Sequence, residues 1–177
     1  MAEEAVSTTP DAKPRSRYDI IADIVAGERF GPGERASLRR NDRSHVVGQP
    51  AFHRLLALQE IDVPYHEAPA WGTIVQAIAQ TAANGHHLKT GTALAASGLS
   101  EARFVKLMAA SGDALLDQVG IIARYLAAKQ SAISWTDLAD LLLADANGND
   151  ERASDKRFRI AKHYYRELHK LDQQKSA

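Results

Sequence analysis

Arginine is concentrated in one short segment of the chain, residues 33–56, which reads GERASLRRNDRSHVVGQPAFHRLL. A guanidinium group is permanently charged and matches a phosphate or carboxylate with two parallel N–H donors. A cluster of such groups therefore indicates an anionic partner. The segment contains five of them: Arg35, Arg39, Arg40, Arg43 and Arg54.

A second cationic group is predicted on the last helix, ERASDKRFRIAKHYYRELHKL. At 100° per residue, six side chains fall within an arc of about 80° and form a ridge about 27 Å long. A nearly single-signed ridge can follow a phosphate backbone without reading sequence. The alternative is an ordinary solvated helix face, although such faces usually mix both signs. The ridge comprises Arg152, Lys156, Arg159, His163, Arg166 and Lys170.

Charge is segregated along the chain even though 22 basic and 22 acidic side chains give a net charge of zero. Residues 13–54 carry nine basic and five acidic side chains, and residues 152–177 carry eight and three. Residues 107–151 carry two and seven. This asymmetry favours an anionic partner for the basic ends. The acidic segment either faces a basic neighbouring protein or keeps one face of this chain away from DNA.

The sequence argues against catalysis and against a bound metal or other cofactor. His86 and His87 are adjacent, so they project about 100° apart on a helix and cannot form the i, i+4 pair of a helical zinc site. The segment GERFGPGE lacks the Lys-Ser/Thr ending of a phosphate-binding loop. The aspartates are scattered, whereas a metal-dependent nuclease needs a carboxylate cluster.

A helix-turn-helix regulator is the alternative function. The segment LAASGLSEARFVKLM reads as a helix, a Gly-containing turn and a second helix, which is the pattern of that motif. Its second helix could present Ser100, Glu101, Arg103 and Lys106 to a major groove. The same pattern joins helices in any helical bundle.

Helical periodicity dominates the chain and predicts an all-α fold of about eight or nine helices. Apolar stripes run through residues 71–82, 115–126 and 135–142, and the last of these is expected to have Ser134 as N-cap. Further helices are expected over 18–29, from Pro50, and on either side of a break at Gly98, with Ser100 as N-cap. Trp71 and Trp135 lie on apolar stripes and are expected in the core.

Residues 1–17 are polar and aperiodic and predict a flexible tail, so residues 18–177 form a single helical domain with room for two sub-bundles. The chain contains no cysteine, which favours a reducing cytoplasm. No apolar run approaches the roughly 20 residues of a membrane span.

The order and spacing of five segments resemble the CasB family, the small subunit of the type I-E CRISPR Cascade complex. The segments are ASLRR, PAFHRLL, GTALAASGLSEARFVKLMAA, SWTDLADLLL and DKRFRIAKHYYREL, and the resemblance covers roughly residues 18–171. It implies an all-helical subunit without nuclease activity that binds nucleic acid without sequence preference. In that role it would help to hold the target strand and the displaced strand of an R-loop.

The partners that the resemblance implies are a second copy of the chain, the backbone subunits assembled on CRISPR RNA, and the large subunit. It also places nucleic-acid-binding residues at Arg39, Arg40, Arg54 and Arg124, and at Lys156, Arg157 and Arg159. Lys162 and Arg166 on the same last helix are counted with them. Arg35 and Arg43 have no such support and are expected to be solvated.

Overall fold

The computed structural model describes residues 15–40 and 42–176, and these ranges contain α-helices and no β-strand. The predicted all-α class is confirmed. There are ten α-helices in the described ranges, more than expected, because a short helix begins at Pro32 within the FGPGE segment and another begins at Arg43. The helices are α1 (Arg17–Ala26), α2 (Pro32–Leu38), α3 (Arg43–Val47), α4 (Pro50–Leu58), α5 (Ala68–Thr81), α6 (Thr90–Ala96), α7 (Glu101–Ala109), α8 (Gly112–Ala128), α9 (Thr136–Ala146) and α10 (Asp150–Lys175).

The predicted tail, residues 1–17, lies mostly outside the described residues. Helix α1 begins at Arg17, where the side chain of Ser16 accepts a hydrogen bond of 3.1 Å from the backbone N–H of Asp19. This helix ends before Gly27, earlier than the expected stop at the FGPGE turn, because the backbone of Gly27 is extended.

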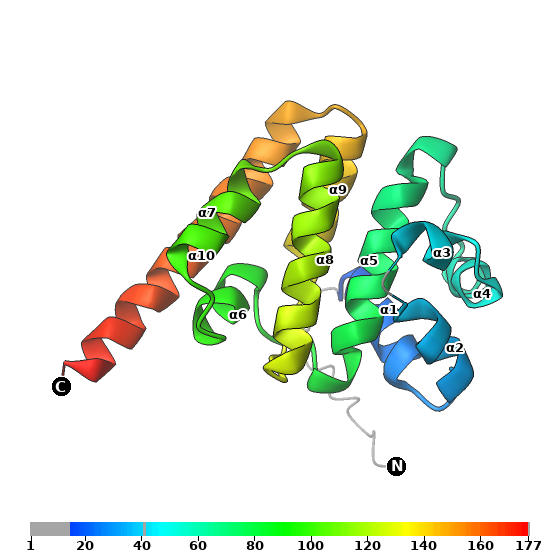
Figure 1. The fold of residues 1–177 in the computed structure, drawn as a ribbon, viewed down its shortest axis with the longest axis horizontal. Helices are drawn as coiled ribbons and strands as arrows, with labels where there is room; N and C mark the ends of the chain where they lie inside the picture. The colour runs from blue at the N-terminus through cyan, green and yellow to red at the C-terminus, as the bar shows by residue number, and fades with distance from the viewer. Residues whose placement is uncertain (1–14, 41, 177) are drawn as a thin grey trace, which may run out of the picture.

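Helix α5 lies at the centre of the fold and is buried on every side from residue 70 to residue 79. It packs against α8, α3, α1 and α9, so a single helix supplies the middle of the core (Figure 1). Trp71 is 2% exposed and Trp135 is 3% exposed, which confirms both as core residues. The indole N–H of Trp135 donates to the hydroxyl of Thr81 on α5 at 2.8 Å and thereby ties α9 to the central helix.

The start of α9 differs from the expected cap. Trp135, not Ser134, is the N-cap residue, and its carbonyl accepts the first helical bond from Ala139 at 2.7 Å. The hydroxyl of Ser134 instead donates to Asp19 of α1 at 3.0 Å. The side chain of Ser134 is therefore engaged in a tertiary contact with α1, whereas the sequence pattern predicted that it would cap α9. Ser100 is the N-cap of α7 as expected, after a turn in which Gly98 has a φ of +78°.

Helix α10 has 26 residues and packs on α6 and α9. Its buried residues include Ile160 and Tyr164. The ring of Tyr164 stacks on Phe104 of α7 at 3.8 Å, and its hydroxyl donates to the carbonyl of Leu99 at 2.7 Å. The C-terminal end of the helix extends beyond the rest of the molecule (Figure 1).

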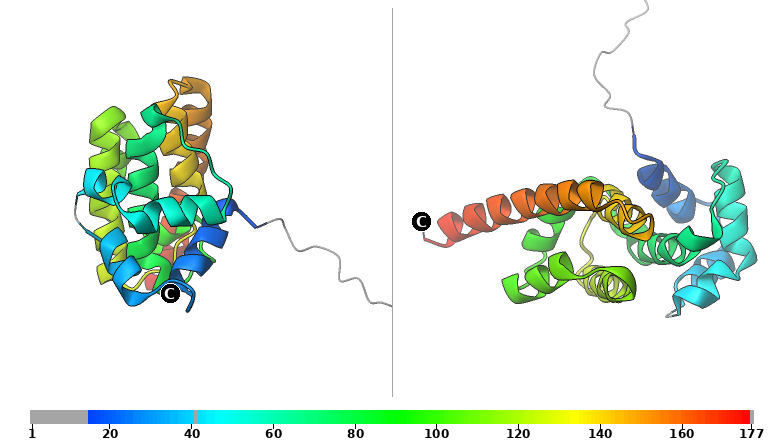
Figure 2. Two further views of the ribbon diagram at one scale, coloured as in Figure 1. Left: turned by 90° about the vertical axis from the view of Figure 1, so that its right-hand side faces the viewer. Right: turned by 90° about the horizontal axis from the view of Figure 1, so that it is seen from above.

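Two opposite faces of the molecule are built from different helices (Figure 2). Helices α7 and α8, with α2 and α3, form the face toward the viewer in Figure 1, called the front face here. Helices α1, α9 and α10 lie on the opposite side, called the rear face. Helix α5 runs between them, so residues far apart in the sequence meet on each face.

Candidate nucleic-acid interface

The cations at the start of α10 pair with carboxylates of α9. The ammonium group of Lys156 lies 2.8 Å from Asp140, and Lys156 is only 9% exposed. Arg159 lies 3.7 Å from Asp137, which is itself buried. Lys156 therefore faces its own protein, whereas the side chain of Arg159 remains half exposed. The predicted role of both as nucleic-acid ligands stays a prediction.

Arg157 is held at the junction of three helices. Its guanidinium donates to the carbonyl of Ala110, at the C-terminal end of α7, at 2.9 Å and lies 3.6 Å from Asp145 of α9. The carboxylate of Asp145 also accepts the backbone N–H of Gly112, the first residue of α8, at 2.7 Å. Arg157 and Asp145 together therefore join the ends of α7 and α8 to α9 and α10.

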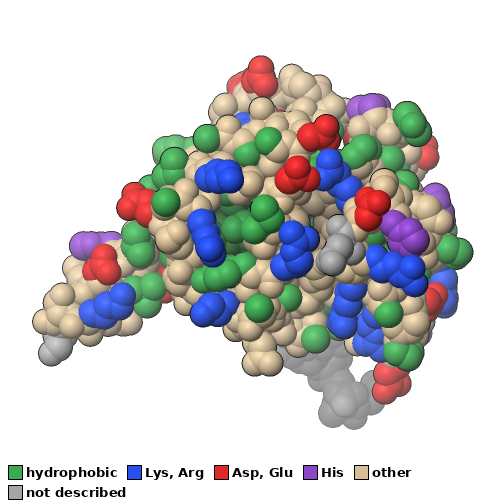
Figure 3. Space-filling view, in the orientation of Figure 1, with side chains coloured by type: hydrophobic (Ala, Val, Ile, Leu, Met, Phe, Trp, Pro, Cys, Tyr) green, Lys and Arg blue, Asp and Glu red, His purple; other side chains and the backbone are tan. Residues whose placement is uncertain are grey.

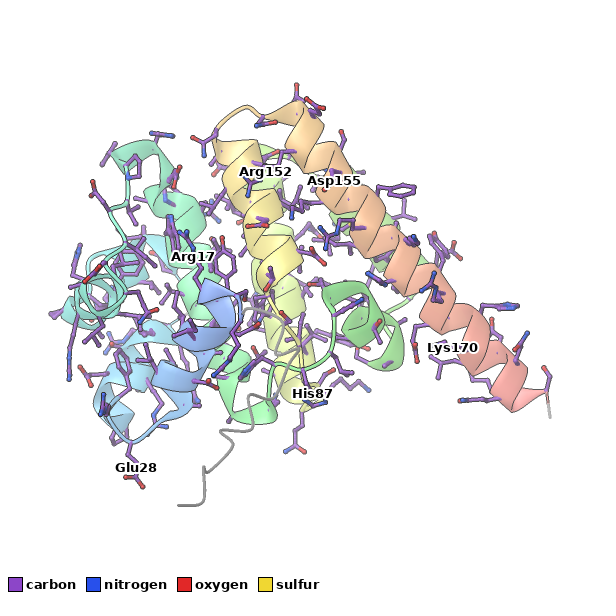
Figure 4. The ribbon with its side chains drawn as sticks, turned by 180° about the vertical axis from the view of Figure 1, so that it is seen from behind. Arg17, Glu28, His87, Arg152, Asp155 and Lys170 are labelled. Atoms are coloured by element: carbon purple, nitrogen blue, oxygen red, sulfur yellow. The ribbon has the colours of Figure 1, made fainter. Side chains whose placement is uncertain are left out.

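The acidic segment thus meets basic groups of the same chain. Asp140 pairs with Lys156 and with the more exposed Arg152 at 3.7 Å (Figure 4). Asp113 and Asp117 of α8 both bind Arg43 of α3, the first at 2.9 Å. Much of the charge segregation along the sequence is therefore complementarity between helices.

We expect Asp140→Asn to lower the free energy of unfolding by about 1.5 kcal/mol, because it leaves the nearly buried ammonium of Lys156 without its counter-charge. The hydroxyl of Tyr18, whose pKa is raised mainly by burial, also donates to this carboxylate at 3.2 Å. Urea unfolding measures the change. Asp155→Asn, at an exposed carboxylate of α10, is the matched control and should change stability by less than about 0.5 kcal/mol. Equal losses in the two variants would contradict a stabilising role for the Asp140–Lys156 pair.

The remaining cations of α10 are more open. Lys162 and Arg166 are exposed, and neither forms an ion pair with a carboxylate among the described residues. His163 does not extend the cationic ridge at neutral pH, because burial, followed by the charge of Lys89, lowers its pKa.

Arg54 has a local partner as well. Its guanidinium pairs with Glu34 of α2, and the same carboxylate accepts the backbone N–H of Gly31 at the start of that helix at 2.9 Å. The Gly31 N–H and Arg54 together lower the pKa of Glu34. Arg54 also lies 6.0 Å from the ring centre of Phe30. In this position it joins α4 to α2.

Three predicted residues, Arg39, Arg40 and Arg124, carry guanidinium groups that pair with no carboxylate in the described ranges. The Nε of Arg39 donates to the carbonyl of Ala79 on α5 at 2.8 Å, yet the residue remains exposed. Arg40 is exposed and lies 3.2 Å from the Nε2 of His45. Arg124 is exposed on α8. Arg39 and Arg40 lie at the C-terminal end of α2 and Arg124 lies in α8, and both helices belong to the front face.

Sequence reasoning missed part of this cationic surface. Arg43 is not simply solvated as predicted, because two aspartates bind it and its side chain is only 28% exposed. On the other side of α8, Arg103 and Lys129 each lie 5.9 Å from the ring centre of Tyr125. Figure 3 shows Lys and Arg side chains over α7, α8 and α2 on this face. Lys129 follows Tyr125 by four residues at the end of α8, so the sequence spacing could have indicated that contact. Arg103 comes from α7, and only the fold brings it to Tyr125.

Both helices of the predicted helix-turn-helix motif contact α10, the first broadly and the second through Phe104. Helix α6 packs against α10 and α9, whereas α7 packs against α8 and places Phe104 on Tyr164. Of the residues expected to face a groove, Glu101 accepts a hydrogen bond of 2.9 Å from the hydroxyl of Tyr165. This geometry is that of a bundle connection.

The described residues contain neither a metal-binding cluster nor a membrane-spanning helix. No group of three or more His, Cys, Asp or Glu side chains there is placed to hold a metal ion. In the same ranges, no helix combines the length and apolar composition that a bilayer span requires.

The sequence matches the family model described as CRISPR-associated protein Cse2 over residues 34–165, which is 132 of the 177 residues. The chain belongs to the Cse2 family. This is the CasB family of the sequence resemblance, so the chain is a structural subunit of a CRISPR Cascade complex and has other Cascade subunits as partners. Neither the curated proteins nor the solved structures gave a match.

The match to Cse2 includes all the predicted nucleic-acid-binding residues except Arg166. It starts at Glu34, the carboxylate that pairs with Arg54, and it ends at Tyr165, two-thirds of the way along α10. Arg39, Arg40 and Arg124 all lie inside it, as do the paired cations of α10. Arg166 lies just outside it.

Proposed function

We propose that this Cse2-family chain is a non-catalytic subunit that binds nucleic acid without sequence preference and stabilises the R-loop of a type I-E Cascade complex. The contact surface is the front face, with Arg39, Arg40 and Arg124 as its principal phosphate ligands. Lys162 and Arg166 on the outer side of α10 form a second, smaller contact. The complex acts in the cytoplasm against invading DNA.

One contrast carries the proposal. Lys156 and Arg157 at the start of α10 are mostly buried and pair with carboxylates of α9, whereas the three front-face arginines are exposed and have no carboxylate partner among the described residues. A permanently charged, exposed group that no carboxylate neutralises is open to a phosphate, and binding the phosphate releases condensed counterions. Such contacts depend on the backbone and not on the bases, which accounts for binding without sequence preference.

Energetics support a role in R-loop formation. The RNA–DNA hybrid that forms is about as stable as the DNA duplex that it replaces, so contacts between protein and backbone can decide the balance. A rigid helical scaffold with a few phosphate-facing arginines is sufficient for this and requires no chemistry. The two strands held are the target strand and the displaced strand. A second copy of the chain, the RNA-assembled backbone subunits and the large subunit would extend the same surface.

The test compares Cascade assembled with this chain and Cascade assembled without it on one target duplex. We expect the complex without the chain to load guide RNA normally but to lose the R-loop at least tenfold faster, which corresponds to about 1.4 kcal/mol. The lifetime of the R-loop after addition of competitor DNA is the readout. Equal lifetimes would contradict the proposal.

A further inference from the structure

A pocket of about 400 Å³ lies between α3, the start of α5 and the first turn of α8. Its walls are mainly apolar, and Val47, Ala68 and Pro69 contribute to them. Tyr65 stands at its edge and is 96% exposed. An apolar pocket beside a fully exposed aromatic side chain is typical of a surface that binds a partner.

Tyr65 is held in this position by the backbone around it. It opens a short 3₁₀ turn that ends at Glu67, whose backbone N–H donates to the carbonyl of Pro64 at 2.9 Å. The carboxylate of Glu67 accepts the indole N–H of Trp71 at 3.1 Å and the side-chain amide of Asn147 on α9 at 2.8 Å. These bonds tie the turn to α5 and α9, so little conformational freedom is left for Tyr65 to lose when it contacts a partner.

The charge around the pocket is negative. Asp113 lines it with a side chain that is 86% exposed, and Asp117, one turn further along α8, is 61% exposed. These two carboxylates share the single guanidinium of Arg43, so one negative charge is left in excess. Figure 3 shows Asp and Glu side chains over the upper part of α8 in this region of the front face. The region repels a phosphate backbone and attracts a lysine or arginine.

We propose that this pocket receives an apolar side chain of another protein subunit of Cascade, and that a lysine or arginine next to that side chain pairs with Asp113. Membership of the Cse2 family gives the chain protein neighbours. A protein interface is anchored by side chains buried in pockets and is given its specificity by complementary charge. Tyrosine is enriched at such interfaces, because its ring buries a large area while its hydroxyl finds a hydrogen-bond partner. The pocket serves assembly and not contact with nucleic acid, so it goes beyond the proposed function.

The test measures binding of the full chain to Cascade that is assembled with its guide RNA but without this chain and without target DNA. Tyr65→Ser and Asp113→Asn should each weaken binding about tenfold, as read by biolayer interferometry. Both side chains are largely exposed, and Asp117 still pairs with Arg43 in the second variant, so the urea midpoints should change little. Weaker binding by a chain of unreduced stability assigns the effect to the interface and not to the fold.

Leu58→Ser and Asp155→Asn are the matched controls. Leu58 is an exposed apolar side chain and Asp155 an exposed carboxylate, and neither lines the pocket. Both control variants should bind the complex as tightly as the wild type. Equal binding by the wild type and the two pocket variants, or no binding by the wild type, overturns the inference.

Two other occupants of the pocket give different results, and either result overturns the inference. If Tyr65→Ser weakens binding of single-stranded DNA to the isolated chain but leaves binding to the complex unchanged, the pocket takes a base. If the isolated chain sediments as a dimer and the Tyr65→Ser variant as a monomer, the pocket holds a second copy of this chain. The binding assay on the complex contains no target DNA, so its failure leaves the proposed function standing, and failure of the R-loop test leaves this inference standing.

Discussion

Replacing Gly91 with alanine is expected to lower the free energy of unfolding by about 3 kcal/mol, at the upper end of the usual cost of overpacking. Gly91 lies in α6, where that helix crosses α10. A Cβ at this position would lie 2.1 Å from the carbonyl oxygen of Ile160 and 2.7 Å from the backbone nitrogen of Tyr164. Both atoms belong to the backbone of a helix, so neither can move aside without displacing α10.

The matched control for this variant is Gly33→Ala in α2. A Cβ at residue 33 would meet nothing within 4 Å, so alanine should stabilise that helix by roughly 0.5–1 kcal/mol. Urea unfolding, followed by circular dichroism, measures both changes. A Gly91→Ala protein as stable as the wild type would mean that α6 and α10 do not approach each other as closely as described.

Neutralising the three front-face arginines is expected to have the largest effect on binding. With Arg39→Gln, Arg40→Gln and Arg124→Gln combined, affinity for single-stranded DNA at about 0.15 M salt should fall on the order of 50-fold, because three phosphate contacts no longer release counterions. The loss should be the same for strands of unrelated sequence. Electrophoretic mobility shift on two unrelated strands measures it.

The rear face offers a control with the same loss of charge. Arg17, Arg152 and Lys170 are labelled in Figure 4, which views the molecule from behind, and all three are exposed. Replacing these three with glutamine should change affinity only a few-fold, through the long-range field of the protein. Similar losses in the two triple variants would mean that net charge, and not the front face, governs binding.

Sequence periodicity was enough to predict the all-α class and the buried stripes of α5, α8 and α9. Apolar spacing reports which side of a helix is buried, and that depends on neighbours in the sequence. The short helix α3 could not be predicted in this way, because five residues carry too little periodicity. It is held by contacts with residues far along the chain, including those of Arg43 with Asp113 and Asp117.

The predicted cationic ridge of α10 is present, but the sequence did not indicate that some of its cations pair with α9. The periodicity of one helix gives the arc of its cations but not the helix that faces them. In the fold, that side of α10 borders the acidic side of α9, so Lys156 and Arg159 meet Asp140 and Asp137. Charge complementarity between two helices is a property of their packing, and neither sequence segment contains it.

The candidate site was predictable only in part for the same reason. The resemblance to CasB pointed to Arg39, Arg40 and Arg124, but it did not show that Arg54 pairs with Glu34. Which of the predicted cations pair with a carboxylate becomes visible only once the helices are packed together.

The salt dependence of DNA binding tests the central claim most directly. For wild-type protein and the front-face triple variant, the slope of log Kd against log salt concentration is measured on one single strand. Three lost phosphate contacts should reduce this slope by about 2, whereas the rear-face triple variant should keep the wild-type slope. An unchanged slope in the front-face variant would show that Arg39, Arg40 and Arg124 do not contact the phosphate backbone, and would contradict the account.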